Sequence, residues 1–98
     1  MIHHIVLFKL SLEGEAKQSQ IALIKEQLEA LPNVIDELKE IKVSTNINEQ
    51  EEYDFMLLAV LEEKAHIDLY AKHPQHQQIL VDHIKPYLEK RACVDIIV

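Results

Sequence analysis

The chain contains very little of several residue types on which particular classes of protein depend. Among its 98 residues there are one cysteine, one glycine, one arginine and no tryptophan. The single cysteine, Cys93, excludes an internal disulfide and fits a reducing compartment, so we expect a cytoplasmic protein. We interpret this residue as a small buried hydrophobe rather than a nucleophile, which is the usual role of an isolated cysteine.

Positive charge is also scarce, because ten basic residues stand against seventeen acidic ones and the net charge is −7. Nucleic acid or an anionic membrane surface would need a basic face on the protein, and the sequence shows none. The longest apolar runs are far shorter than a membrane span. Met1 leads within a few residues into an apolar run, so we expect no signal peptide.

Motifs for cofactors and metals are missing as well. There is no glycine-rich phosphate loop, and no histidine and cysteine spacing typical of zinc sites. The acidic segment 49–52 lacks the glycine and the regularly spaced aspartates of a calcium loop, so we interpret it as a solvated turn. We therefore expect no cofactor and no bound metal.

What the chain does contain is apolar periodicity of two kinds, within an apolar fraction of 48%. Alternating or continuous apolar runs between polar segments predict strands, and apolar residues three and four positions apart predict helices. Pro74 is well placed as the first residue of a helix. The predicted strands span residues 2–10, 38–44, 53–61 and 92–98, and the predicted helices span residues 15–31, 64–72 and 74–84.

This element order, β-α-β-β-α(α)-β, predicts an α+β fold of the ferredoxin-like type, with a four-stranded antiparallel sheet and its helices on one face. Residues 2–10 and 53–61 are apolar on both sides, although helices can cover only one side. A second copy should cover the other face, because monomers rarely expose a large apolar patch. We therefore expect residues 1–98 to form a single domain that dimerises sheet to sheet into a barrel with an internal pocket.

Two histidines and a tyrosine surround a proline in the segment Tyr70-Ala71-Lys72-His73-Pro74-Gln75-His76. Histidine and tyrosine are well suited to proton transfer near neutral pH. In a functional interpretation, His76 is a general base, and Tyr70 orients the substrate or donates a hydrogen bond to a developing oxyanion. In a structural interpretation, His73 caps the helix that begins at Pro74, while Tyr70 and His76 fill a helix–sheet junction with their polar atoms satisfied.

A third interpretation of the same segment is a metal site. His73, His76 and His83 are spaced so that all three lie near one helix face, and neutral imidazoles suit zinc, nickel or copper. The break expected at Pro74 disturbs that spacing, and no partner motif accompanies it. The residues themselves leave the functional and structural interpretations open.

Four segments also occur in an order typical of a known family. They are the opening strand His4-Ile5-Val6-Leu7-Phe8-Lys9, the pair Tyr53-Asp54, the element Tyr70-x-x-His73-Pro74-x-His76, and the pair Val94-Asp95. Together they cover essentially the whole chain and resemble the stress-responsive A/B barrel (Dabb) family. The resemblance implies a dimeric α+β barrel, in agreement with the pattern of strands and helices. Because most members are uncharacterised proteins linked loosely to stress, it also implies a stress-associated or accessory role.

A plant branch of this family acts as a cofactor-free polyketide cyclase that uses a pocket tyrosine and histidine. The resemblance assigns these roles to Tyr70 and His76 and places His4 in the pocket, although that branch has a histidine where Phe55 stands here. It thus implies either a protein that binds a small hydrophobic metabolite or a cofactor-independent enzyme of the cyclase or monooxygenase type. The expected pocket residues are His4, Val6, Phe8, Phe55, Leu57, Tyr70, His73 and His76.

Overall fold

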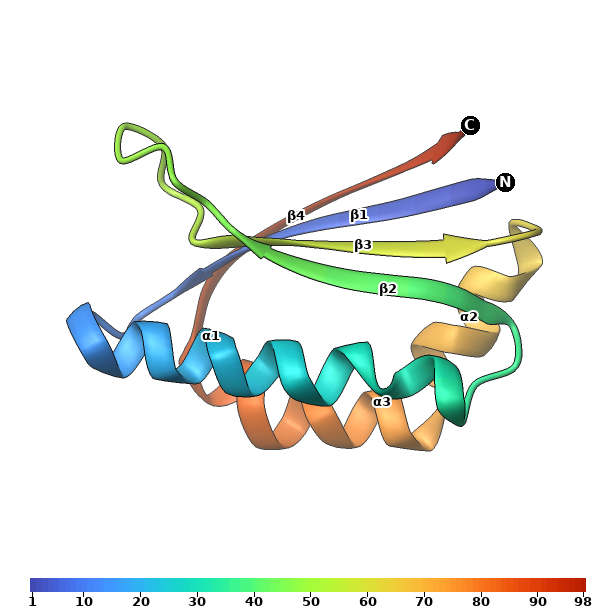
Figure 1. Ribbon diagram of the computed structural model, residues 1–98, viewed down its shortest axis with the longest axis horizontal. Helices are drawn as coiled ribbons and strands as arrows, with labels where there is room; N and C mark the ends of the chain where they lie inside the picture. The colour runs from blue at the N-terminus through green and yellow to red at the C-terminus, as the bar shows by residue number, and fades with distance from the viewer.

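The computed structural model describes all residues from 1 to 98 as a sheet with every helix on one side (Figure 1). The chain follows the predicted order of elements. The strands are β1 (Ile2–Leu10), β2 (Leu38–Thr45), β3 (Phe55–Leu61) and β4 (Leu88–Ile97); the helices are α1 (Gly14–Glu29), α2 (Ala65–Lys72) and α3 (Pro74–Ile79), and three short helical turns are η1 (Leu31–Asn33), η2 (Leu80–Ile84, a π-helix) and η3 (Lys85–Tyr87).

The four strands form one antiparallel sheet in the order β2-β3-β1-β4. The two strands that are apolar on both sides, β1 and β3, take the two central positions, where neighbouring strands pair with both of their edges. This arrangement confirms the predicted ferredoxin-like α+β fold. The N- and C-terminal strands are direct neighbours, and both chain ends lie at the same end of the sheet (Figure 1).

Element boundaries differ from the predicted ones mainly at the last strand. β4 begins at Leu88 rather than at residue 92, and its first residues pair with the end of β1. The segment 89–91 is charged, so its sequence shows no apolar alternation. Edge strands tolerate such residues because one side of the strand remains in water, and the sequence pattern therefore missed this part of the strand.

The two faces of the sheet differ in what covers them. Val6, Phe8 and Leu57 point toward the helices and are almost fully buried, at 2–4% exposure. Helices cover this face because α1 presents a regular apolar stripe of Ile21, Ile24 and Leu28 to it. No helix covers the opposite face, which carries polar residues on β2 and at its margins and a set of apolar side chains, most of them only half-buried or exposed: Ile5, Leu7, Met56, Leu58, Val60, Ala92, Val94 and Ile96.

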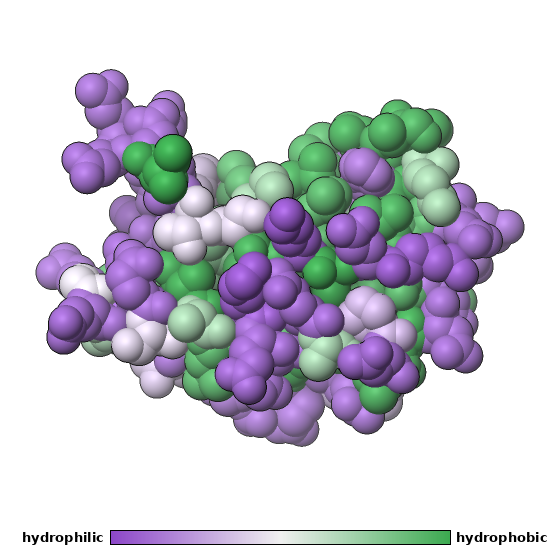
Figure 2. All heavy atoms as spheres, viewed as in Figure 1, coloured by the Kyte–Doolittle hydropathy of each residue, from purple (hydrophilic) through white to green (hydrophobic).

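Exposed apolar residues gather where β1 begins and β4 ends. Figure 2 shows this patch as the green area at the upper right, above the helices. Val94 is 53% exposed and Ile96 is 42% exposed, both on the uncovered face. A contiguous apolar surface of this kind marks an interaction site on a small protein.

The pair Tyr53-Asp54 has a clear structural role at the start of β3. The carboxylate of Asp54 accepts a hydrogen bond from the Leu10 backbone nitrogen at 2.7 Å and contacts Lys17 Nζ at 3.0 Å. These contacts tie the entry of β3 to the end of β1 and to the first turns of α1.

None of the helices combines the length and apolar character that a membrane-spanning segment needs.

Candidate ligand-binding site

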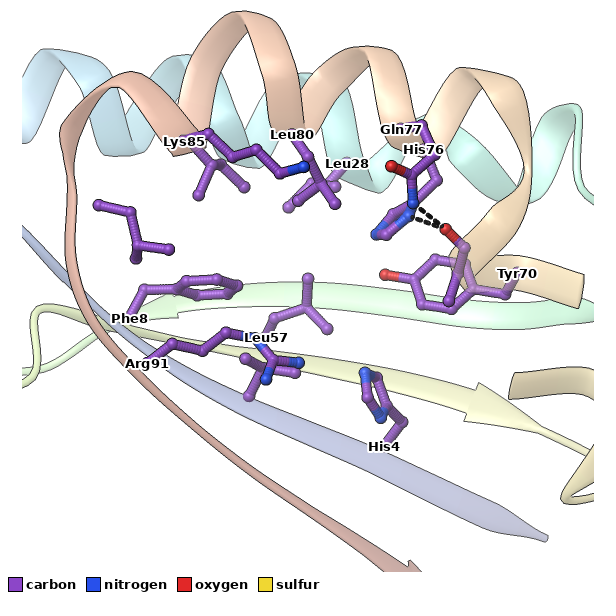
Figure 3. A pocket seen from close by; sticks show the side chains of 14 residues that line it. His4, Phe8, Leu28, Leu57, Tyr70, His76, Gln77, Leu80, Lys85 and Arg91 are labelled. Atoms are coloured by element: carbon purple, nitrogen blue, oxygen red, sulfur yellow. Dashed lines mark hydrogen bonds between the residues drawn. The ribbon is translucent and has the colours of Figure 1, made fainter. Parts of the chain in front are cut away.

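A cavity of about 280 Å³ lies between the covered face of the sheet and the helices α2, α3 and η2 (Figure 3). This volume is near the lower end of small-molecule sites, so it suits a compact ligand. Apolar side chains form most of the wall, and the polar groups come from β1, β4, α2, α3 and η3. The lining residues are His4, Val6, Phe8, Leu28, Leu57, Tyr70, Ala71, His76, Gln77, Leu80, Ile84, Lys85, Leu88 and Arg91.

The break between α2 and α3 positions the histidine of the cavity. Pro74 has no backbone N–H, and the N–H of Gln75 donates to Nδ1 of His73 at 3.1 Å, so neither can bond the Ala71 carbonyl. That carbonyl instead accepts from His76 Nδ1 at 2.8 Å and from Gln77 Nε2 at 2.6 Å (Figure 3). Backbone groups left unpaired at the break therefore hold the His76 ring in one orientation.

The hydrogen bond to Ala71 also fixes the tautomer of His76. A carbonyl oxygen can only accept, so Nδ1 carries the proton and Nε2 keeps a free lone pair. Burial lowers the pKa of His76, and the hydrogen bond to Ala71 opposes this effect only in part. Neutral imidazole with a free Nε2 is the form that accepts a proton or a hydrogen bond from a ligand.

Tyr70 closes the same end of the cavity from the last turn of α2. Its side chain is 1% exposed, and burial raises its pKa well above the ordinary value, with the charge of Arg91 opposing the rise. The ring centroid lies 4.4 Å from that of His76 and 6.1 Å from that of His4. The hydroxyl points into the cavity in Figure 3 and has no hydrogen-bond partner within the chain, so it is available as a neutral donor.

His4 enters the cavity from β1 and is held by a residue of the neighbouring strand. His4 and Asp95 are directly opposite each other in the β1–β4 pairing, and His4 Nδ1 lies 2.5 Å from Asp95 Oδ1. A carboxylate bound at Nδ1 orients an imidazole and leaves Nε2 for a ligand. The sequence pattern placed Asp95 on an alternating face but gave no sign of this partnership, because the pairing register of the two terminal strands was unknown.

Cys93 is exposed, which contradicts its interpretation as a buried residue. It lies on the helix-facing side of β4, which is an edge strand of the sheet. Its Sγ is 3.6 Å from His4 Nδ1, and donor atoms of His4, Cys93 and Asp95 all lie within 4.8 Å of one another. Nitrogen, sulfur and oxygen donors of this kind suit a transition metal, although structural zinc sites use four protein ligands.

The structure places the expected pocket residues in different surroundings. His4, Val6, Phe8, Leu57, Tyr70 and His76 line the cavity, whereas Phe55 and His73 do not. Phe55 is 1% exposed and stacks on Phe8 with ring centroids 5.0 Å apart, behind the cavity wall. His73 caps α3, as the structural interpretation predicted. The donor atoms of His73, His76 and His83 do not come together, so the metal site considered for these three is wrong.

Comparison with known proteins places the fold and the family. Residues 2–98 match the family described as the stress responsive A/B barrel domain, Dabb. The structure resembles a dimeric protein of unknown function with a ferredoxin-like fold from Bacteroides fragilis NCTC 9343, with a TM-score of 0.84, 35% sequence identity, and coverage of 97% of this chain and 93% of that chain. It also resembles a dimeric ferredoxin-like protein of unknown function from Thermobifida fusca YX, with a TM-score of 0.80, 28% sequence identity, and coverage of 99% of this chain and 90% of that chain.

A hydroxynitrile lyase from Passiflora edulis shares the fold, with a TM-score of 0.78, 20% identity, and coverage of 99% of this chain and 92% of that chain. At this identity the likeness concerns the fold alone. Among curated proteins, no sequence matches this chain. The match along nearly the whole length, together with the 35% identical relative, shows that the chain belongs to the stress responsive A/B barrel (Dabb) domain family.

Proposed function

We propose that this protein is a cytoplasmic homodimer that binds a small, largely apolar molecule in the cavity between its sheet and α2, α3 and η2. The observation that carries the proposal is the cavity itself, in which the polar groups gather around Tyr70, His76 and His4 while the remaining wall is mostly apolar. Pockets of this composition hold a ligand by apolar contact and orient it with a few polar groups.

The dimer in this proposal forms through the uncovered face of the sheet. Ile5 lies near the centre of that face, between Leu58 on β3 and Val94 on β4. Apolar residues of this kind are covered in most stable proteins, and a second sheet related by a two-fold axis is the simplest cover. The relatives from B. fragilis and T. fusca are described as dimeric, which supports the same arrangement here. The exposed free thiol of Cys93 fits a reducing compartment.

Native mass spectrometry of freshly purified, untagged protein tests the proposal. We expect a dimer that carries an organic adduct, which is released on denaturation. Leu80→Trp, which places a large ring in the cavity wall, should remove the adduct. The neighbouring Val81→Trp is the matched control, because Val81 is 53% exposed and does not line the cavity. A monomer would refute the assembly, and an adduct that survives Leu80→Trp unchanged would refute its location.

A second candidate function, a cofactor-independent enzyme, is favoured by the geometry of two residues. The free Nε2 of His76 can accept a proton from a carbon next to a substrate carbonyl, and the unpaired hydroxyl of Tyr70 can donate to the oxyanion that forms. Cyclase-like and monooxygenase-like reactions both begin with such an activated carbon. Relatives of the same fold include a hydroxynitrile lyase, so the fold is compatible with acid–base chemistry.

Proton abstraction can be measured without knowing the natural substrate. In D₂O, acetophenone exchanges its methyl protons only if a base removes them, and NMR follows the loss of the signal. We expect the protein to accelerate this exchange, His76→Gln to remove the acceleration, and His83→Gln to retain it, because His83 does not line the cavity. Equal exchange rates with wild-type protein, with His76→Gln and without protein would contradict the enzyme candidate.

A further inference from the structure

Two cationic side chains line the cavity of a chain whose net charge is −7. Arg91 is the only arginine of the protein, and it lies on β4 directly opposite Phe8 of β1. Lys85 comes from η3, on the helical side of the cavity. Figure 3 shows the Arg91 guanidinium extending along the sheet beside Leu57 and the Lys85 ammonium lying near Leu80.

Neither cation is neutralised within the chain. Five of the nine lysines form ion pairs with carboxylates, and neither Arg91 nor Lys85 makes one. The paired lysines are Lys9, Lys17, Lys25, Lys39 and Lys90. No aspartate or glutamate lines the cavity, and the nearby carboxylate of Asp95 is already bound to His4. The cavity lining therefore carries two cationic side chains and no acidic one, in a protein whose net charge is −7.

The charge of Arg91 also reaches the polar end of the cavity. It opposes the rise in the pKa of Tyr70 that burial causes, so the guanidinium and the phenol interact across this space. Tyr70 contributes a neutral hydrogen-bond donor there. A donor and a nearby cation, with apolar walls beside them, are the features that recognise an anion attached to an apolar body.

We propose that the ligand of this cavity is a small monocarboxylate with an apolar body, whose carboxylate pairs with Arg91 and whose body contacts Val6, Phe8 and Leu57. This inference rests on the proposed ligand-binding function and names the ligand class. Arg91 can hold a carboxylate with two parallel N–H donors. Lys85 adds positive charge from the opposite wall, and the Tyr70 hydroxyl is available to the same group.

The expected loss of affinity follows from removing one charge-assisted pair, that between the Arg91 guanidinium and the ligand carboxylate. Removing the guanidinium should weaken binding of a carboxylate by about 10- to 100-fold, which is the usual range for hydrogen bonds to charged groups. A neutral amide of the same shape cannot form that ion pair. Its affinity should change by less than about 2-fold on the same substitution, because its contacts with the apolar walls are retained.

The experiment is an NMR titration of the isotopically labelled full chain with two matched pairs of probes, benzoate with benzamide and hexanoate with hexanamide. Methyl signals of Leu57 and Leu80 report occupancy of the cavity. The proteins compared are wild type, Arg91→Gln and the charge-matched control Lys64→Gln, which removes an exposed lysine that does not line the cavity. We expect each carboxylate to bind more tightly than its amide, and only Arg91→Gln to remove the difference.

Three outcomes would overturn the inference, and they separate it from the proposed function. Amides that bind at the cavity as tightly as carboxylates would refute the anionic ligand while leaving a binding cavity in place. Displacement of benzoate by an equal concentration of inorganic phosphate would show a general anion site without selection for an apolar body. Absence of any shift at Leu57 and Leu80 with all four probes would refute the ligand-binding cavity, and with it the inference.

Discussion

The substitution Tyr70→Phe separates the functional interpretation of the cavity from the structural one. Tyr70 is 1% exposed, so its ring belongs to the core, whereas its hydroxyl faces the cavity and has no partner within the chain. Removing only the hydroxyl leaves no buried group of the protein unpaired. We therefore expect the free energy of unfolding to change by less than about 1 kcal/mol, because the penalty for a lost hydrogen bond comes mostly from the partner left behind.

Removing the whole ring gives a scale for comparison. Tyr70→Ala deletes a buried aromatic side chain in contact with the rings of His76 and His4, which should cost about 3 to 5 kcal/mol. For a domain of this size, each kcal/mol corresponds to a shift in Tm of about 4 to 8 °C. Urea unfolding followed by circular dichroism, together with the acetophenone exchange assay, measures both properties of each variant.

The two interpretations then predict different pairs of results. If Tyr70 is a donor for a ligand, Tyr70→Phe keeps its stability and loses exchange activity or ligand affinity. If the hydroxyl is instead needed by the fold, its removal should destabilise the protein by about 1 to 3 kcal/mol. A loss of stability in that range would refute our account of the Tyr70 hydroxyl, whatever the activity of the variant.

Ile5→Glu should convert the dimer into monomers in analytical ultracentrifugation, because it places a charge at the centre of the uncovered sheet face. The control is Leu69→Glu, which should remain a dimer because Leu69 lies on α2 and is already 53% exposed. A dimeric Ile5→Glu variant would refute the assembly. His76 binds its proton less tightly in the folded state than in the unfolded state, whose pKa is near 6.5. Its contribution to stability is therefore present above that pKa and is lost as the pH falls from there toward the lower folded value. The free energy of unfolding of His76→Gln, measured by urea denaturation at several pH values, should therefore decrease less between pH 7 and pH 5 than that of the wild type. Equal decreases in the two proteins would contradict the lowered pKa.

Much of the fold could be predicted from the sequence because it depends on local patterns. The strand β1 was predicted with its observed bounds, and the break at Pro74 follows from its missing N–H and fixed backbone angle. Two apolar faces on β1 also indicated that something besides the helices must cover the sheet. Periodicity alone could not decide which face the helices would take, because both faces of β1 and β3 are apolar.

Three residues at the site that the sequence did not predict come from β4. Asp95, Cys93 and Arg91 face the helix side of the sheet opposite His4, Val6 and Phe8. Their positions depend on the register between the first and the last strand, which are separated by nearly the whole chain. A shift of one residue would turn every one of these side chains to the opposite face, so no local pattern could predict which of them reach the cavity.

The position of His76 at the polar end of the cavity depends on which hydrogen bonds the backbone groups make at the break between α2 and α3. A continuous helix would have bonded the Ala71 carbonyl to the backbone N–H of residue 75, and His76 would then have no fixed partner near its ring. Because Pro74 and the cap of His73 leave this carbonyl free, it holds His76 Nδ1 and directs Nε2 away from the backbone. The proline that divides the helix and the histidine that serves the cavity therefore form one local unit. Replacing Pro74 should alter the orientation of His76 as well as the length of the helix.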